Sequence, residues 1–220
     1  MASSDRAPRL NRDDVLRAAL ALLNEVGIDA LSTRKLAERL GVQSPTLYWH
    51  FKNKAALLDA MSAAVMLESR ARDTPAPGER WQDWLLADGL SFRSALLACR
   101  DGARLHAGTR PGEAQRASIE ARLGRLCAAG FAPGPATLLL MSVGRFVVGW
   151  VLEEQASRQP GAPPSATLAG PDAAHHPLLA AGWAATVGGD ADAVFERALR
   201  QLLDGAEAQL NAARASRPAG

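Results

Sequence analysis

Tyr48, Trp49 and His50 stand side by side in the segment SPTLYWHF at residues 44–51. A helix cannot bury positions 47, 48, 50 and 51 together on one narrow face, so we expect Tyr48 and His50 to stay exposed while Phe51 packs inward. Exposed aromatic groups beside short polar side chains suit contact with bases and phosphates. This run therefore points to nucleic-acid binding.

The spacing across residues 33–51 fits a helix-turn-helix unit. Ala37 is small where two helices must cross, Gly41 makes the turn four residues later, and Val42 and Leu47 face inward. In that geometry the second helix lies in the DNA major groove and its N-terminal residues meet base edges.

The side chains expected at the bases are short or flat. Gln43, Ser44 and Thr46 offer hydrogen bonds, and Pro45 and Tyr48 offer apolar contact suited to a thymine methyl. Residues 30–56 carry five cations against one acid, a local charge of +4 (five minus one) on a chain of +2 overall; they are Arg34, Lys35, Arg39, Lys52 and Lys54 against Glu38. Such local charge is expected where a protein contacts the phosphate backbone.

The elements that position this unit are predicted to be helices. Apolar residues recur at helical spacing nearly everywhere and no segment alternates like a strand. The expected caps and stops are Asn11 before the first helix, with Asp13 and Asp14 in its first turn, Gly27 at its end, Ser32 and Gly41 around the second helix, and Ser44 with Pro45 opening the third.

Further helices are predicted at 81–99, 112–129, 135–157, 177–186 and 190–213, after a break at 73–79. The Pro- and Gly-rich stretch at about 157–177 is predicted to be a mobile loop. The apolar run 136–152 contains Arg145 and is short for a bilayer crossing, so we expect a helix buried on most sides.

Composition is typical of a soluble globular protein, with 48% hydrophobic and 22% charged residues. Cys99 and Cys127 lie far apart and without metal-ligand spacing, which favours two reduced thiols. The first residues contain no apolar signal-like stretch. We expect a cytoplasmic protein with no membrane partner.

The segment RLHAGTRPGE holds His106, which by itself is most often a packed or surface histidine. Glu153 and Glu154 end an apolar helix, where a solvated helix end is the ordinary interpretation. Residue types alone leave the role of these side chains open.

The segment LSTRKLAERLGVQSPTLYWHFKNKAALLDA resembles the DNA-binding head of the TetR family of transcriptional regulators. Residues 81–111 and 142–155 are similar to the family's effector domain, and the similarity covers most of residues 10–157, resuming weakly near HPLL and the last helix. The resemblance implies an all-α homodimer with an N-terminal helix-turn-helix head and a C-terminal ligand-binding and dimerisation domain. The implied divisions are a flexible N-terminus 1–10, a DNA-binding domain 11–54, a linker helix 55–72 and an effector and dimerisation domain 73–220.

The resemblance also implies residue roles at double-stranded operator DNA. Thr33 and Arg34 would touch the backbone and a base; bases would be read by Gln43, Ser44, Pro45, Thr46 and Tyr48, and phosphates held by Trp49, His50 and Lys54.

In the effector domain, the resemblance implies that His106 binds a Mg²⁺ ion chelated by a tetracycline-like molecule. Glu153 of the other subunit would act through metal-bound water, with Thr109 nearby, and Phe92 and Arg110 would line the pocket. Mg²⁺ keeps several waters and leans on substrate oxygens, so it suits such a sparse set of protein ligands.

The rest of the implied pocket departs from the family pattern. This chain has Arg70, Asp88, Arg122 and Arg145 where the pattern has His, Asn, Gln and His. Arginine prefers planar anionic partners, although arginines that pair with Asp88 or point outward would leave a neutral pocket. The ligand is therefore expected to be a tetracycline relative, another aromatic polyketide or a more acidic molecule that needs no metal.

The hypothesis is a repressor that a small molecule releases from a palindromic operator, controlling an efflux or resistance gene by analogy. Residues 135–157 and 190–213 of two copies would form the dimer seam. An enzyme centred on His106 and Glu153 is the rival from another class, but it lacks a recognisable nucleophile–base pair. A regulator that binds DNA only when loaded is the second alternative.

Overall fold

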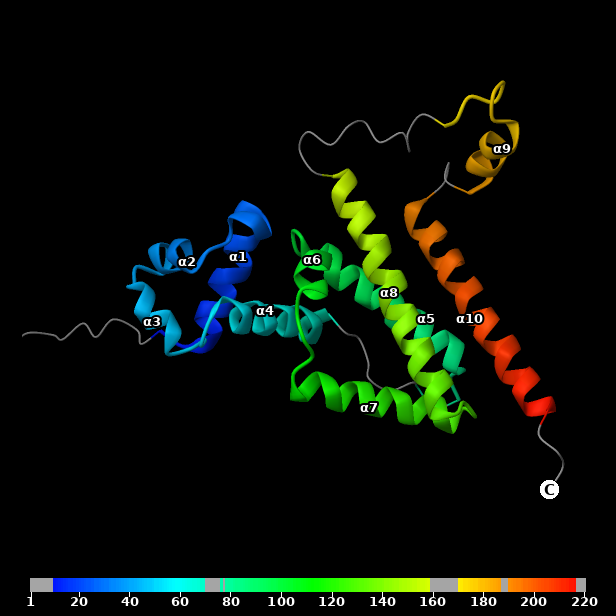
Figure 1. The fold of residues 1–220 in the computed structure, drawn as a ribbon, viewed down its shortest axis with the longest axis horizontal. Helices are drawn as coiled ribbons and strands as arrows, with labels where there is room; N and C mark the ends of the chain where they lie inside the picture. The colour runs from blue at the N-terminus through cyan, green and yellow to red at the C-terminus, as the bar shows by residue number, and fades with distance from the viewer. Residues whose placement is uncertain (1–9, 70–75, 77, 159–169, 187–189, 217–220) are drawn as a thin grey trace, which may run out of the picture.

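The computed structural model describes residues 10–69, 76, 78–158, 170–186 and 190–216, and these residues form ten α-helices without a strand (Figure 1). The all-α prediction is confirmed. The helices are α1 Arg12–Ala30, α2 Thr33–Leu40, α3 Ser44–Tyr48, α4 Lys54–Ser69, α5 Trp81–Leu97, α6 Gly102–Ala107, α7 Glu113–Ala128, α8 Pro133–Ser157, α9 Pro177–Thr186 and α10 Ala191–Ala215.

The head consists of α1, α2 and α3, and its caps follow the sequence. The Asn11 side chain accepts a hydrogen bond from the Asp14 N–H at 2.8 Å, and the Asp14 side chain accepts one from the Asn11 N–H. Together these two bonds form a capping box. Gly27 adopts φ 77° and breaks the regular helix, as predicted, with one short turn continuing to Ala30. Ser32 accepts the Lys35 N–H at 3.2 Å.

The turn between α2 and α3 depends on Gly41, which lies in the left-handed region at φ 65°. The next N–H, that of Val42, bonds the Ala37 carbonyl at 3.0 Å, so the turn satisfies the carbonyls at the end of α2. The cap of α3 differs from the prediction. Gln43 rather than Ser44 is its N-cap, because the Thr46 N–H already closes the first turn on the Gln43 carbonyl at 2.9 Å.

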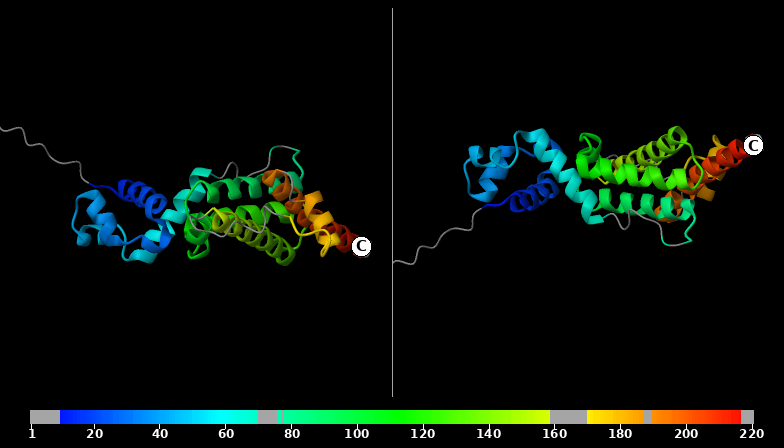
Figure 2. Two further views of the ribbon diagram at one scale, coloured as in Figure 1. Left: turned by 90° about the horizontal axis from the view of Figure 1, so that it is seen from above. Right: turned by 90° about the horizontal axis from the view of Figure 1, so that it is seen from below.

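Helix α4 leaves the head and packs against α5 and α6 of the body, so it joins the two ends of an elongated molecule (Figure 2). The predicted linker at 55–72 runs past the described residues, which end here at Ser69. In the body α5 is central, packed against α4, α6, α8 and α10. Its buried side chains include Trp84, Leu85 and Leu96, and they meet Phe195 and Leu199 of α10 in one apolar core.

Helix α8 corrects one expectation. It is not buried on most sides, because a single stripe that includes Val143, Val147 and Val151 packs into the core while Leu138 and Met141 are exposed. Within the described chain it is also the one helix long and apolar enough to cross a membrane by length and composition. The single chain thus leaves one side of α8 uncovered.

Helix α6 did not appear in the sequence-based prediction. It has only six residues and begins after Asp101, a non-glycine residue at φ 57°. Six residues hold fewer than two helical turns, too few for a periodic apolar pattern. Two segments were predicted to be flexible, the N-terminus and the loop at about 157–177. Residues 1–9 of the first segment and residues 159–169 of the second lie outside the described part of the chain.

Candidate DNA-binding face and effector cavity

The aromatic run follows its spacing at Tyr48 and Phe51, but His50 is half-buried rather than exposed as predicted. Phe51 is 6% exposed and packs in the head, whereas Tyr48 is 52% and Trp49 88% exposed. A guanidinium, that of Arg12, lies 4.9 Å from the Phe51 ring centroid. The two large aromatic side chains therefore leave the core and face solvent at the end of α3.

The other predicted DNA-contact residues lie on the same part of the head. Nine of the ten are on α2, on α3 or in the turns before and after α3: Thr33, Arg34, Gln43, Ser44, Pro45, Thr46, Tyr48, Trp49 and His50. The tenth, Lys54, is exposed at the first position of α4. Arg34 lies 3.4 Å from Glu38, so part of the positive charge on α2 is offset locally.

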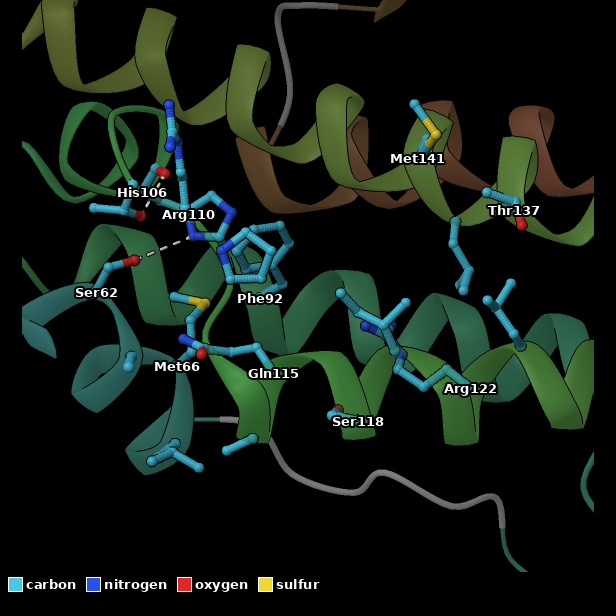
Figure 3. A pocket seen from close by; sticks show the side chains of 18 residues that line it. Ser62, Met66, Phe92, His106, Arg110, Gln115, Ser118, Arg122, Thr137 and Met141 are labelled. Carbon is cyan, nitrogen blue, oxygen red and sulfur yellow. Dashed lines mark hydrogen bonds between the residues drawn. The ribbon is translucent and has the colours of Figure 1, made fainter. Parts of the chain in front are cut away.

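A cavity of about 570 Å³ opens among α4, α5, α6, α7 and α8. Five predicted ligand-binding residues line it, namely Phe92, His106, Thr109, Arg110 and Arg122 (Figure 3). Most of the remaining wall is apolar, with Met66, Leu67, Ile119, Leu123, Leu140 and Met141. A largely apolar wall with a few convergent polar groups is the usual composition of a small-molecule site.

His106 sits half-buried in the last turn of α6, and its neighbours fix its ring. Its Nδ1 lies 3.4 Å from the Ser62 hydroxyl oxygen, and its ring meets Phe92 edge-on with centroids 5.0 Å apart. The Thr109 hydroxyl donates to the His106 carbonyl at 2.9 Å. The imidazole therefore contacts side chains from α4 and α5, and the loop that follows α6 is tied to the His106 backbone.

The donor set around His106 suits a metal that brings its own ligands. No group of three or more His, Cys, Asp or Glu side chains gathers anywhere in the described residues, so these residues do not form a closed protein metal site. One imidazole nitrogen beside a cavity of this size fits Mg²⁺ that takes its other ligands from water and from oxygens of a bound molecule. Thr109 lines the same cavity as His106.

Arg122 and Asp88 form an ion pair in the deep wall of the cavity, with side chains 8% and 6% exposed. The Arg122 guanidinium also lies 5.9 Å from the Trp84 ring centroid. Arg122 lines the cavity and Asp88 stands behind it. The carboxylate offsets the guanidinium charge, so this wall is polar and close to neutral overall.

Other predicted ligand residues lie elsewhere in this chain. Arg145 is exposed on α8 and does not line the cavity, and Arg70 falls outside the described residues. Glu153 is exposed on α8 beside a small hollow shared with Asp101 and Arg104. One copy of the chain therefore does not bring Glu153 and His106 into a common cavity.

Sequence reasoning missed the junction between head and body, where polar contacts join the end of α1 to the start of α6. Arg104 binds Asp29 through two bonds of 2.7 and 2.9 Å, and Asp101 accepts the Ile28 N–H at 2.9 Å. The Arg104 bond lowers the pKa of the Asp29 carboxyl and raises that of the guanidinium. These partners are 73–75 residues apart in sequence, so no local pattern signals them.

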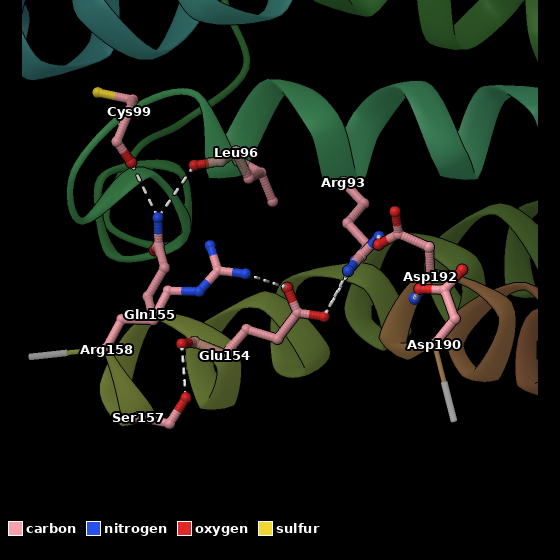
Figure 4. Close-up of polar contacts among 9 residues, drawn as sticks. All are labelled: Arg93, Leu96, Cys99, Glu154, Gln155, Ser157, Arg158, Asp190 and Asp192. Atoms are coloured by element: carbon pink, nitrogen blue, oxygen red, sulfur yellow. Dashed lines mark hydrogen bonds and ion pairs between the residues drawn. The ribbon is translucent and has the colours of Figure 1, made fainter. Parts of the chain in front are cut away.

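A second missed cluster anchors the end of α8 (Figure 4). Arg93 of α5 binds Glu154 at 2.7 Å and Asp192 of α10 at 2.7 Å. Gln155 donates to the carbonyls of Leu96 and Cys99 at 3.1 and 2.8 Å. The two residues after Glu153 thus fix α8 against α5, α10 and the turn before α6.

The fold and site define a DNA-binding regulator with a separate ligand cavity, and comparisons with known proteins agree. Residues 15–61 match the model of bacterial regulatory proteins of the tetR family, and residues 74–210 match the tetracyclin repressor-like C-terminal domain. The chain belongs to the TetR family of transcriptional regulators, which are not enzymes.

Within that family the chain is a homologue of the tetracycline repressors. It is 49% identical over 197 residues to the class A tetracycline repressor from transposon 1721 of Escherichia coli, covering 90% of both chains. A solved class A TetR in complex with 5a,6-anhydrotetracycline and magnesium is 43% identical, with a TM-score of 0.68 and coverage of 90% of this chain and 98% of that one. A TetR variant from Acinetobacter baumannii AYE in complex with minocycline is 45% identical, with a TM-score of 0.74 and coverage of 91% and 98%.

Proposed function

We propose that this chain is a homodimeric repressor that a magnesium chelate of a tetracycline releases from palindromic operator DNA. One observation carries the proposal. His106, Thr109, Phe92 and Arg110 converge on one largely apolar cavity in a chain homologous to tetracycline repressors, one of which was solved with anhydrotetracycline and magnesium.

At the DNA, the N-terminal part of α3 would enter the major groove, with Gln43, Ser44 and Thr46 at base edges. The exposed Trp49 and Lys54 would lie toward the backbone. A palindrome places its half-sites about one helical turn, ~34–36 Å, apart. Two copies of the head must therefore be held at that separation, which assigns the body the role of a spacer.

At the cavity, His106 would be the protein ligand, and Glu153 of a second copy would hold the water around the ion. Magnesium, when bound, would supply positive charge to the oxygens of the chelating molecule. Thr109 orients the loop by its bond to the His106 carbonyl. The apolar wall from Met66 to Leu140 would cover the rings of the ligand.

The pairing of Arg122 with Asp88 indicates what charge the ligand carries. Because Asp88 already pairs with the Arg122 guanidinium in a buried position, the deep wall does not demand an anionic ligand. A planar ligand that is neutral or zwitterionic overall fits better than a strongly acidic molecule, and this favours a tetracycline over the metal-free anionic alternative.

Coupling would pass through the short helix α6. Its last turn carries both His106 and, two residues earlier, Arg104, which binds Asp29 at the end of α1. A ligand that draws His106 toward the cavity would therefore shift the head. To move the protein from mostly bound to mostly released, the ligand must prefer the released state by about 10⁴-fold, roughly 5.5 kcal/mol.

The dimer seam would be formed by α8 and α10, whose outward sides remain uncovered in one chain. Leu138 is 63% exposed on α8. Burying this side chain against a second copy would remove it from water and bring Glu153 toward the partner's cavity. We place the protein in the cytoplasm, where the operator DNA lies, and propose an efflux or resistance gene as its target.

Quenching of tryptophan fluorescence by tetracycline in the presence of Mg²⁺ or of EDTA tests the proposal. Saturable quenching with Mg²⁺ that EDTA removes is the expected result. Tight binding of another compound in EDTA, with no response to any tetracycline, would overturn the chelate assignment.

A further inference from the structure

A serine on α4 contacts the histidine of the effector cavity. The Ser62 hydroxyl oxygen lies 3.4 Å from His106 Nδ1, and Ser62 itself is 3% exposed (Figure 3). Both side chains line the cavity. The contact therefore joins the helix that leaves the head to the proposed metal ligand.

The hydrogen bond to Nδ1 decides what the other ring nitrogen can do. A neutral imidazole has one N–H and one lone pair on its two nitrogens. If Nδ1 donates to Ser62, the lone pair is on Nε2 and can bind a metal. If Ser62 donates to Nδ1, the proton is on Nε2 and metal binding there is blocked.

We propose that Ser62 is a positioning residue that accepts the Nδ1–H of His106 and holds the tautomer whose Nε2 can bind a metal. The assignment of the metal rests on the proposed function above. A ligating histidine usually gives its second N–H to an acceptor that fixes its tautomer and ring orientation. The Ser62 hydroxyl oxygen, 3.4 Å from Nδ1, stands where such an acceptor would lie.

Two features support the acceptor role. A serine inside a helix commonly directs its own hydroxyl proton to a backbone carbonyl one turn earlier, which leaves oxygen lone pairs for a second partner. The imidazole also meets the Phe92 ring edge-on, with ring centroids 5.0 Å apart. The ring therefore has a preferred orientation in which Nδ1 meets Ser62.

The experiment compares wild type with Ser62→Ala and Ser118→Ala. Ser118 lines the same cavity from α7, so its substitution controls for loss of a cavity hydroxyl. Serine and alanine are close in volume, and circular dichroism checks that both variants fold. The first readout is the ¹⁵N chemical shifts of the His106 ring nitrogens in metal-free protein, recorded at a pH above which these shifts no longer change.

Wild type and Ser118→Ala are expected to show a protonated Nδ1 and an unprotonated Nε2, and Ser62→Ala a mixture of tautomers. The second readout is affinity for tetracycline with Mg²⁺, which should fall by roughly 10-fold or more in Ser62→Ala. Ser118→Ala is the control for the ring tautomer alone, because Ser118 also lines the ligand cavity. Ser62→Thr, which keeps the hydroxyl, should restore the wild-type tautomer.

Identical ring shifts in wild type and Ser62→Ala would overturn the inference, as would a wild-type ring protonated at Nε2. Failure of the proposed function would look different. Wild type would then show no Mg²⁺-dependent binding of tetracycline, while the ring shifts would still report whether Ser62 sets the tautomer.

Discussion

The head and the cavity differ in how their functional residues are brought together. In the head, nine of the ten predicted DNA contacts fall within Thr33–His50, on two short helices and the turns beside them. The cavity takes its lining from five helices between Ser62 and Met141. Local spacing therefore organises the first site, and long-range packing organises the second.

The same difference predicts where a single substitution acts. A change on the surface of α3 should alter DNA binding and leave the body folded, because those side chains are exposed. A change in the cavity wall should alter folding, ligand binding or both, because its side chains are also part of the core. The following experiments, from the largest expected effect to the smallest, test this separation.

Asp88→Ala should have the largest effect, on stability. It leaves the Arg122 guanidinium buried without its carboxylate, and breaking a buried pair in this way costs about 3–5 kcal/mol. Urea unfolding followed by circular dichroism measures the loss. The double variant Asp88→Asn with Arg122→Gln should lose much less, since it removes both charges. A loss as large in the double variant would show that packing rather than charge is responsible.

His106→Ala should weaken Mg²⁺-dependent tetracycline binding by at least about 100-fold, the upper end of what loss of an outer partner costs at a metal site. Operator binding without ligand should change little, because the residue lies in the body. Fluorescence titration and DNA binding on the same preparation give both values. Equal losses of ligand and DNA affinity would instead indicate a general folding defect.

In the head, Gln43→Ala and Lys54→Ala form a matched pair. Loss of a base contact at Gln43 should cost about 1–3 kcal/mol and relax preference at one base pair. Loss of a phosphate contact at Lys54 should weaken binding to all sequences alike and reduce the salt dependence by about one unit of slope. Binding of both variants to altered operators at several salt concentrations separates these two effects. A loss of base preference in Lys54→Ala, with a reduced salt dependence in Gln43→Ala, would contradict the proposed groove geometry.

Arg104→Ala should have the smallest effect, reducing the coupling between ligand and operator by about 0.5–2 kcal/mol without loss of either affinity alone. The same bond predicts a pH dependence. The bond to Arg104 lowers the pKa of the Asp29 carboxyl below 3.8. The stabilisation that this bond gives to the junction is therefore fully present above pH 3.8, and it is lost as the pH falls through the lowered pKa and the carboxylate is protonated. Ligand-induced release measured at pH 7 in both proteins tests the coupling, and unchanged coupling would remove this junction from the mechanism.

The comparison also explains how much the sequence could predict. Caps, turn glycines and helical spacing depend on neighbours a few residues away, so Asn11, Ser32 and Gly41 could be placed without a structure. For Arg122 the sequence left two alternatives open, pairing with Asp88 or pointing outward, because the two arrangements cannot be told apart from the sequence. The contacts of Ser62 with His106 and of Arg104 with Asp29 join residues 44 and 75 positions apart, and only the folded chain brings them together.

The uncovered side of α8 shows a second feature that the sequence could not predict. Apolar periodicity predicted a buried helix, but it could not say whether the covering surface belongs to the same chain. Leu138 remains exposed in one copy, so its burial is assigned to the proposed dimer.

The central claim is that occupation of the His106 cavity releases the α3 face from DNA. The most direct measurement is fluorescence anisotropy of a labelled duplex that carries the inverted repeat upstream of the protein's own gene. Tetracycline added with Mg²⁺ should lower the anisotropy to that of free DNA, and tetracycline with EDTA should not. Anisotropy that stays high with saturating tetracycline and Mg²⁺, or that rises on addition of ligand, would contradict the account.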